Sequence, residues 1–277
     1  MPPVRTNREH TNGSADRQPG PRQWLDESLQ WPPMSRQWFI ADLHLAAERP
    51  QTLALFERFM ADYTQSGDTL FILGDLFDVW VGDDDGAEPA GRVRDVLRRA
   101  SRRGITVKIQ RGNRDFLMGR RLMRDCGVQL LPDCVVTQVA GQPTLLMHGD
   151  LLCTDDVDYQ RARRYLRNPL LQWLVLRLPL SRRRRIGAGI RRRSGEATAI
   201  KTSDIMDVNL DTVSRYLDRY RVSQLIHGHT HRPAVHRHRL PDGRTATRIV
   251  LPEWHAGHAA AWLDDGERLQ TVEFATG

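Results

Sequence analysis

The chain has 277 residues, of which 40% are hydrophobic, and its formal net charge is +7. This length suits one large domain, or one domain with an insert, and allows a sizeable core. No apolar run is long enough for a transmembrane helix, and the positive charge favours anionic partners, namely phosphate substrates, nucleic acid or an acidic membrane surface.

The first part of the chain, residues 1–35, is rich in Pro, Gly, Arg, Asn and Ser. It lacks the apolar stretch of a secretory signal, and its composition predicts a disordered extension. We therefore expect the folded domain to comprise residues 36–277.

Five apolar, strand-like runs follow along the chain, and each ends close to a residue that can bind a metal. They are Trp38–Ala41 before Asp42, Thr69–Leu73 before Asp75, Ile105–Ile109 before Asn113, Thr144–Met147 before His148, and Ser223–Ile226 before His229. Amphipathic helical patterns lie between several of them, at Leu53–Tyr63 and Val93–Ala100. Strands that alternate with helices predict an α/β fold that binds ligands at the carboxyl ends of its strands.

The pattern changes after Asp150. Residues 151–203 are predicted to be helical and are very rich in Arg, and an apolar segment, Leu170–Leu180, lies between the Arg clusters. We interpret this region as a helical cap inserted into the main fold. The apolar segment either covers part of a substrate or only packs the cap onto the body, with the Arg clusters in solvent. Short strand-like pieces, separated by Pro, Asp and Gly, follow from Ala234 to Phe274.

The polar residues after the strands form five short motifs. In chain order they read DLHL from Asp42, GDLFD from Gly74, GNRD from Gly112, HGD from His148 and GHTH from Gly228. Mixed oxygen and imidazole ligands suit Mn, Fe or Zn rather than Ca, and two such ions about 3.5–4 Å apart can hold a phosphate and activate water. Each motif alone is weak evidence, because Asp75 could cap a helix and Asn113 could belong to a turn. The ordered set is what favours a two-metal site.

Taken together, the motifs of residues 36–233 resemble those of the calcineurin-like metallophosphoesterase superfamily. The resemblance implies two mixed β-sheets flanked by helices. It also implies that one metal binds Asp42, His44, Asp75 and His231, and that the other binds Asp75, Asn113, His148 and His229, with Asp75 as the bridge.

Arg114 departs from the superfamily pattern, which usually has His after the Asn. An Arg cannot act as a general acid near neutral pH, but it can hold a phosphate by two parallel hydrogen bonds. The leaving group should therefore need little protonation, as a phosphate monoester does when it leaves a pyrophosphate.

Longer segments, among them GDLFDVWVGDDD from Gly74 and HGHTHRPAVH from His227, resemble the UDP-2,3-diacylglucosamine pyrophosphatases of lipid A biosynthesis. This resemblance implies two Mn²⁺ ions and the release of UMP and 2,3-diacylglucosamine 1-phosphate (lipid X) by attack of water on the α-phosphorus. The catalytic residues that it implies are Asp75, Asn113, Arg114 and His148. The substrate-binding residues that it implies are Asn113, Arg114, Asp156, Ser194, Thr198, Lys201 and His229, where Thr198 replaces the usual Asn.

The same resemblance implies a monomer on the cytoplasmic face of the inner membrane of a Gram-negative bacterium, with no nucleic-acid partner. The three cysteines have no paired CxxC spacing, which favours a reducing compartment. Two alternatives stay open: a generic two-metal phosphodiesterase or nucleotide pyrophosphatase, and a catalytically silent basic module that binds membrane or nucleic acid. Asp78 and Asp83–Asp85 are expected to form a solvated acidic loop, and Tyr159 belongs either to the cap region of the site or to the core.

Overall fold

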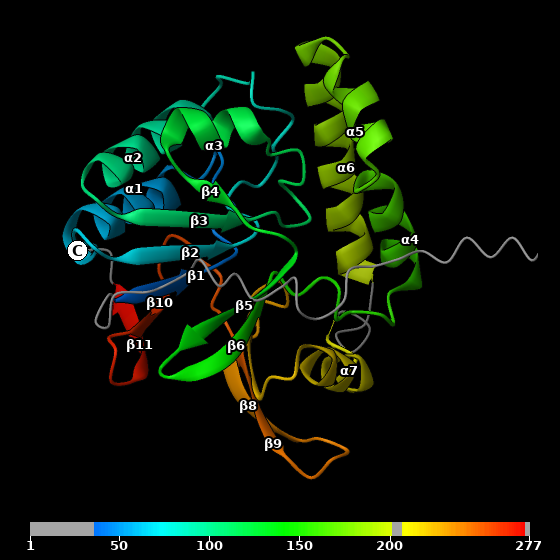
Figure 1. Cartoon of the computed structure of the whole chain (residues 1–277). Helices are drawn as coiled ribbons and strands as arrows, with labels where there is room; N and C mark the ends of the chain where they lie inside the picture. Colours follow the sequence, from blue (N-terminus) through cyan, green and yellow to red (C-terminus); the bar gives the residue numbers. More distant parts are fainter. Residues whose placement is uncertain (1–35, 201–206, 275–277) are drawn as a thin grey trace, which may run out of the picture.

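Two mixed β-sheets face each other, and helices cover the outer face of each (Figure 1). The structure, a computed structural model, describes residues 36–200 and 207–274, so the predicted extension at residues 1–35 lies outside the described residues. The first sheet has the strand order β11-β10-β1-β2-β3-β4, and the second has the order β5-β6-β7-β9-β8. The predicted fold class is therefore confirmed.

The strands of the described chain are β1 (Gln37–Ile40), β2 (Thr69–Leu73), β3 (Thr106–Gln110), β4 (Gln129–Leu130), β5 (Cys134–Val139), β6 (Gln142–Met147), β7 (Gln224–His227), β8 (Ala234–Arg239), β9 (Thr245–Val250), β10 (Ala259–Asp264) and β11 (Leu269–Phe274). The helices are α1 (Pro50–Arg58), which continues into the π-helix η2 (Phe59–Tyr63), α2 (Ala90–Arg102), α3 (Arg120–Cys126), α4 (Val157–Leu166), α5 (Pro169–Leu176), α6 (Leu180–Ile200) and α7 (Leu210–Tyr220).

The central strands are apolar along their whole length because both of their faces are covered. On β1, Trp38 and Ile40 pack with α1 and α2, whereas Phe39 points to the second sheet. Phe39 stacks on Phe71 of β2, with ring centroids 5.1 Å apart, between the two sheets. A further cluster, which includes Val213, attaches α7 to the outer face of the second sheet. Parallel strands buried in this way are typical of α/β proteins.

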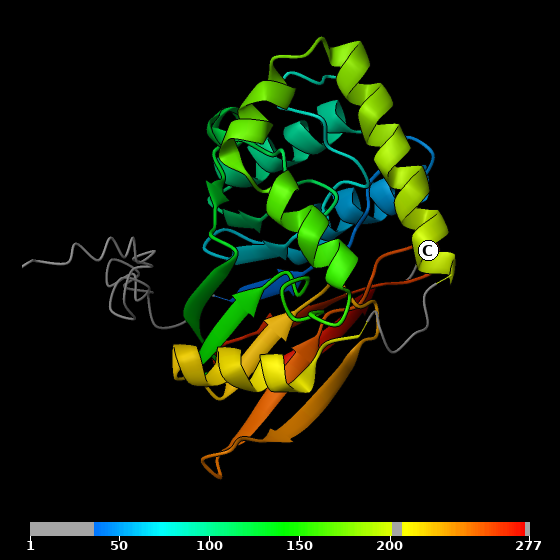
Figure 2. The same cartoon turned by 90° about the vertical axis from the view of Figure 1, so that its right-hand side faces the viewer.

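The cap consists of α4, α5 and α6, which stand beside the sandwich (Figures 1 and 2). Asp156 and Asn168 begin α4 and α5, where their side chains accept hydrogen bonds from free backbone N–H groups. On α5 no residue is buried, and Leu170, Trp173 and Leu174 are 65%, 48% and 50% exposed. The apolar segment therefore packs only in part onto the body, through Val175. Within the described part of the chain, no helix is both long and apolar enough to span a bilayer.

Candidate dinuclear metal centre

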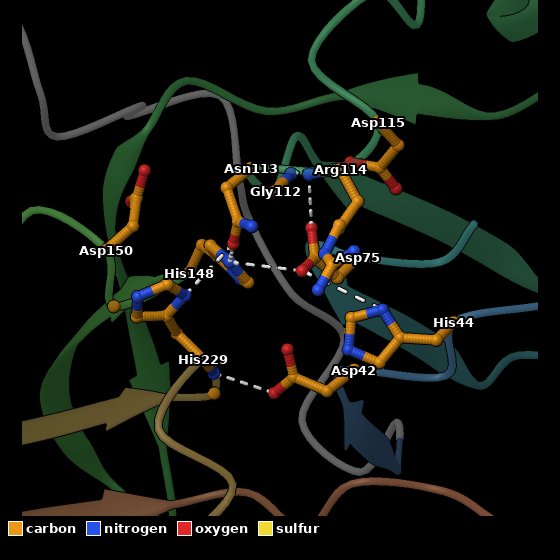
Figure 3. A network of polar contacts seen from close by, with 12 residues as sticks. Asp42, His44, Asp75, Gly112, Asn113, Arg114, Asp115, His148, Asp150 and His229 are labelled. Carbon is orange, nitrogen blue, oxygen red and sulfur yellow. Dashed lines mark hydrogen bonds and ion pairs between the residues drawn. The ribbon is translucent and has the colours of Figure 1, made fainter. Parts of the chain in front are cut away.

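The predicted metal ligands come together where five strands end (Figure 3). Asp42 and His44 follow β1, Asp75 follows β2, Asn113 follows β3, His148 follows β6, and His229 and His231 follow β7. The loops also bind one another through their backbones, because the N–H of Asp42 donates to the Gly74 carbonyl at 3.2 Å and the N–H of His44 donates to the Asp75 carbonyl at 2.9 Å.

The backbone at these positions adopts a conformation that is unusual for residues other than glycine. Positive φ angles occur at Asp42 (54°), His44 (45°), Asp75 (50°), His229 (71°) and His231 (53°). Such angles cost of order 1–3 kcal/mol each and cluster at functional sites. In the described chain only Ala140 and Arg221 share this feature outside the motifs, so the strain is concentrated in the candidate site.

The glycines of the motifs give the ligands room. A Cβ atom on Gly112 would lie 2.0 Å from Oδ1 of Asp75, and one on Gly228 would lie 2.3 Å from Oδ2 of Asp42. A Cβ atom on Gly74 would lie 2.5 Å from Nδ1 of His148. Each glycine therefore permits the close approach of a ligand that another motif provides.

One group of ligand atoms belongs to Asp42, His44 and His231, and all of these atoms lie within 4.8 Å of one another. Nε2 of His44 is 3.3 Å from Nε2 of His231, which is 3.6 Å from Oδ1 of Asp42. A second group belongs to Asp42, Asp75 and His148. Asp42 contributes to both groups, whereas the prediction assigned it to one metal.

Asp75 connects these groups, and Asn113 adds His229 to the second one. Oδ2 of Asp75 lies 3.9 Å from Nδ1 of His44 and 3.8 Å from Nε2 of His148, which places this carboxylate between a histidine of the first group and one of the second. Oδ1 of Asn113 lies 2.9 Å from Nε2 of His148 and 3.0 Å from Nδ1 of His229. The structure thus brings all of the predicted ligands together, with Asp75 between His44 and His148.

Further contacts orient the histidine rings. Nδ1 of His148 donates to the Leu73 carbonyl at 2.8 Å, so Nε2 faces the centre. Nδ1 of His231 lies 2.9 Å from Oε2 of Glu253, so Nε2 of this ring also faces inward. Metal-binding histidines commonly have such an outer partner on their second nitrogen.

Two of the orienting carboxylates were not identified from the sequence. Glu253 lies in the loop after β9, outside any motif. Asp115 ends the GNRD motif, where its buried carboxylate accepts hydrogen bonds from the N–H groups of Gly112 at 2.7 Å and Leu76 at 2.8 Å. Asp115 thereby holds together the two loops that carry Asn113 and Asp75. Its position within the GNRD motif is the sequence signal that could have identified it.

The electrostatics of the centre fit a bound cation. Burial raises the pKa of Asp75 to about 6 and lowers the pKa of His44 to about 4. Burial alone would lower the pKa of His231, but its contacts with Asp42 and Glu253 raise that pKa to about 10. Oδ1 of Asp42 and Nδ1 of His44 are buried without a hydrogen-bond partner. A buried polar atom without a partner is costly, and a divalent ion with oxygen and nitrogen ligands would satisfy both atoms.

A cavity of about 790 Å³ extends from this centre to the cap. Its lining includes Asn113 and Arg114 near the centre, and Tyr165, Leu171 and Ile190 of the cap. Of the remaining predicted substrate residues, Asp156 and His229 line the cavity. Ser194 and Thr198 lie on α6, at positions whose side chains the structure does not describe, and Lys201 lies outside the described residues.

Tyr159 belongs to the site. Its hydroxyl donates to Oδ2 of Asp150 at 2.8 Å, its ring lies 5.9 Å from that of His229, and it lines the cavity. Asp150, which also accepts from Nε of Arg163 at 2.6 Å, attaches α4 to the loop that carries His148. Tyr159 therefore connects the cap with the metal ligands.

The prediction of a solvated acidic loop was wrong except for Asp84, whose side chain is 48% exposed. The Asp78 side chain is buried and forms ion pairs with Arg114 and with Arg191 of α6. Asp84 and Asp85 pair with Arg183 and Arg184 at the start of the same helix, and Asp83 accepts from the backbone N–H groups of Gly119 and Leu122. The loop is held against the cap because the Arg clusters supply the opposite charge.

Comparison with known proteins gives the family. The family model described as calcineurin-like phosphoesterase matches residues 35–233. A UDP-2,3-diacylglucosamine hydrolase of Edwardsiella ictaluri is 47% identical over 235 residues, which cover 85% of this chain and 90% of the relative. Proteins with the same name from Actinobacillus succinogenes and Escherichia coli O81 are 44% and 46% identical, over 83% and 78% of this chain and 96% and 90% of the relatives.

The family match covers every candidate metal ligand and all three helices of the cap. The matches confirm the resemblance inferred from the motifs, and with it the dependence on a divalent metal. The chain belongs to the calcineurin-like phosphoesterase family, among the UDP-2,3-diacylglucosamine hydrolases.

Proposed function

We propose that the protein hydrolyses the pyrophosphate bond of UDP-2,3-diacylglucosamine to UMP and 2,3-diacylglucosamine 1-phosphate, using two Mn²⁺ ions. The observation that carries this proposal is the cavity, which has the predicted metal ligands at one end and the apolar side chains of the cap at the other. A substrate with a pyrophosphate and two acyl chains matches both ends. The names of the similar proteins support the same reaction.

The ligands for the metals would be the residues that converge at the strand ends: Asp42, His44, Asp75, Asn113, His148, His229 and His231. When bound, the two ions supply positive charge that holds a phosphate and lowers the pKa of water. Asp75 would bridge them, because its Oδ2 atom lies between His44 and His148.

Arg114 would hold the phosphate that leaves. It lines the cavity beside Asn113, and its Nε atom is buried without a hydrogen-bond partner. A guanidinium stabilises negative charge through its hydrogen bonds but does not serve as a general acid. This property suits a phosphate leaving group and is less suited to an alkoxide.

The cap would bind the rest of the substrate. Asp156 can accept hydrogen bonds from a sugar hydroxyl or an amide, and His229, itself a proposed metal ligand, lines the cavity next to Tyr159 of the cap. Ser194, Thr198 and Lys201 extend the proposed contacts along and beyond α6. The insert at residues 151–203 thus forms the lipid-binding part of the single domain at residues 36–277.

Release of UMP tests the proposal. With Mn²⁺ the purified protein should convert UDP-2,3-diacylglucosamine to UMP, and EDTA should abolish the conversion until Mn²⁺ is restored. The same assay with an aryl phosphodiester covers the alternative of a generic phosphodiesterase. Turnover of the aryl ester without any release of UMP would refute the substrate assignment.

We also propose that the cap docks on the anionic cytoplasmic face of the inner membrane of a Gram-negative bacterium, with the protein as a monomer. The exposed α5 carries Leu170, Trp173 and Leu174, and the guanidinium of Arg177 lies 3.8 Å from the Trp173 ring centroid. Apolar side chains beside cations are typical of helices that lie at a membrane surface.

Replacing both Trp173 and Leu174 by Ser should weaken binding to vesicles that contain phosphatidylglycerol by at least about tenfold, because their apolar area no longer enters the bilayer. Cosedimentation measures the change. Val235→Ser is the matched control, since Val235 is an exposed apolar residue on β8, at 52% exposure. Equal binding by the double variant and the control would contradict docking through α5.

A further inference from the structure

Three charged side chains from separate parts of the chain meet at the cavity. Asp78 lies in the loop after β2, Arg114 lies in the loop after β3, and Arg191 lies on α6 of the cap; all three line the cavity. Oδ1 of Asp78 is 3.6 Å from a guanidinium nitrogen of Arg114, and its Oδ2 contacts Nε of Arg191. One carboxylate of the body therefore contacts a guanidinium of the body and one of the cap.

The burial of Asp78 makes these contacts specific. The Asp78 side chain is 7% exposed, whereas those of Arg114 and Arg191 are 24% and 41% exposed. A buried carboxylate that lost its partners would be strongly destabilised, so Asp78 favours the arrangement in which both guanidinium groups stay close to it. Two positive charges with one negative charge between them leave this three-residue cluster with a net positive charge, which suits a phosphate.

Arg114 is also fastened at its backbone. Its N–H donates to Oδ1 of Asp75 at 2.8 Å. The backbone of Arg114 is thus fixed by the predicted bridging ligand and its side chain by Asp78, so the direction of the guanidinium depends on both carboxylates. Neither contact involves a part of the substrate.

We propose that Asp78 is a positioning residue that holds Arg114 and Arg191 as a pair facing the phosphate of the substrate. Because Arg191 lies on α6, Asp78 also links the geometry of the phosphate site to the position of that helix. The cap, which covers the lipid, thereby helps to align Arg114, which holds the phosphate. This inference rests on the proposed function, because it concerns the phosphate-binding end of the same cavity.

The chain offers a matched control on the same helix. Arg184 of α6 pairs with Asp85 of the acidic loop at 2.6 Å, and its side chain is 49% exposed, close to the 41% of Arg191. The Asp85 side chain is 15% exposed, and neither member of this pair lines the cavity. Both pairs connect the cap with the body, but only the Asp78 pair includes residues that face the cavity.

The experiment compares Asp78→Asn with Asp85→Asn in the full chain loaded with Mn²⁺, by kcat and KM for release of UMP. Asp78→Asn should lower kcat/KM by up to about 100-fold, as misplaced catalytic groups do, while Asp85→Asn stays within about twofold. Asp78→Glu should recover part of the loss because it restores the carboxylate. Equal kinetics for Asp78→Asn and Asp85→Asn would overturn the proposal.

A double variant separates positioning from a merely structural role. If Asp78 acts through Arg191, Arg191→Gln should cost clearly less in the Asp78→Asn background than in the wild-type protein. Independent, multiplying losses would overturn the proposal, as would losses that only follow the midpoint of thermal unfolding. If the wild-type protein releases no UMP, the proposed function fails. The role of Asp78 is then tested separately, by binding of inorganic phosphate to the Mn²⁺-loaded wild-type protein and the Asp78→Asn variant. Weaker binding by Asp78→Asn supports the positioning role, and equal binding refutes it.

Discussion

Replacing Asp75 by Ala should reduce the release of UMP at least about 100-fold, which is the loss that changes in the outer partners of metal ligands already cause. The side chain is buried, lies between the two groups of ligands, and accepts the backbone N–H of Arg114. Without this carboxylate, the positive charge of two ions would be poorly balanced. We expect metal analysis to find fewer than two Mn²⁺ ions per chain.

The matched control for this variant is Asp95→Ala, which removes an exposed carboxylate of α2 that pairs with Arg98 on the same helix. It should keep full turnover and full metal content. Asp75→Ala should still bind anionic vesicles, because α5 lies outside the metal centre. Unchanged turnover in Asp75→Ala would refute the bridging role, and loss of vesicle binding would point to unfolding.

Replacing Arg114 by Ala should lower kcat by about 10²–10³, the usual cost of removing one group that stabilises charge in the transition state. Metal content should stay near that of the wild-type protein, because Arg114 contacts Asp75 through its backbone N–H, which Ala retains. Steady-state kinetics and metal analysis of the same preparation measure both effects. A variant that loses its metal but keeps normal turnover per bound ion would contradict the assignment.

Two further substitutions separate charge from geometry at this position. Arg114→Lys keeps the charge but loses the planar pair of donors, so it should recover only part of the activity. Arg114→His introduces a group that can donate a proton near neutral pH. Compared with Arg114→Ala, the Arg114→His variant should therefore gain more activity toward aryl phosphodiesters than toward the substrate that releases UMP.

The convergence of the candidate ligands was predictable from the sequence because its signals are local. Each central strand is a continuous apolar run, and each run leads into a short motif, so strand and ligand are read from the same few residues. The carboxyl ends of neighbouring parallel strands meet at one edge of a sheet. This geometry brings Asp42, Asp75 and Asn113 together once the strand order is known.

The contacts of the cap were not predictable in the same way. The partners Asp84 and Arg183 are 99 residues apart, and no periodicity links them. An acidic loop and an Arg-rich helix are each typical of solvent-exposed segments, and only the folded arrangement shows that their charges neutralise each other. Glu253 escaped notice for a related reason, since a single Glu after a strand has no pattern that points to His231.

The place of the cap in the topology has a consequence for how substrate preference can change. Strands β6 and β7 are parallel neighbours, and such a pair needs a crossover connection in any case. The helix α7, which packs on the second sheet, can make that crossover by itself. The cap is therefore an addition to a connection that the fold already contains, and its length or composition can vary while the strands that carry the ligands keep their register. If the cap binds the lipid as proposed, exchange of this one module between related chains should change which lipid is accepted and leave the candidate metal ligands in place.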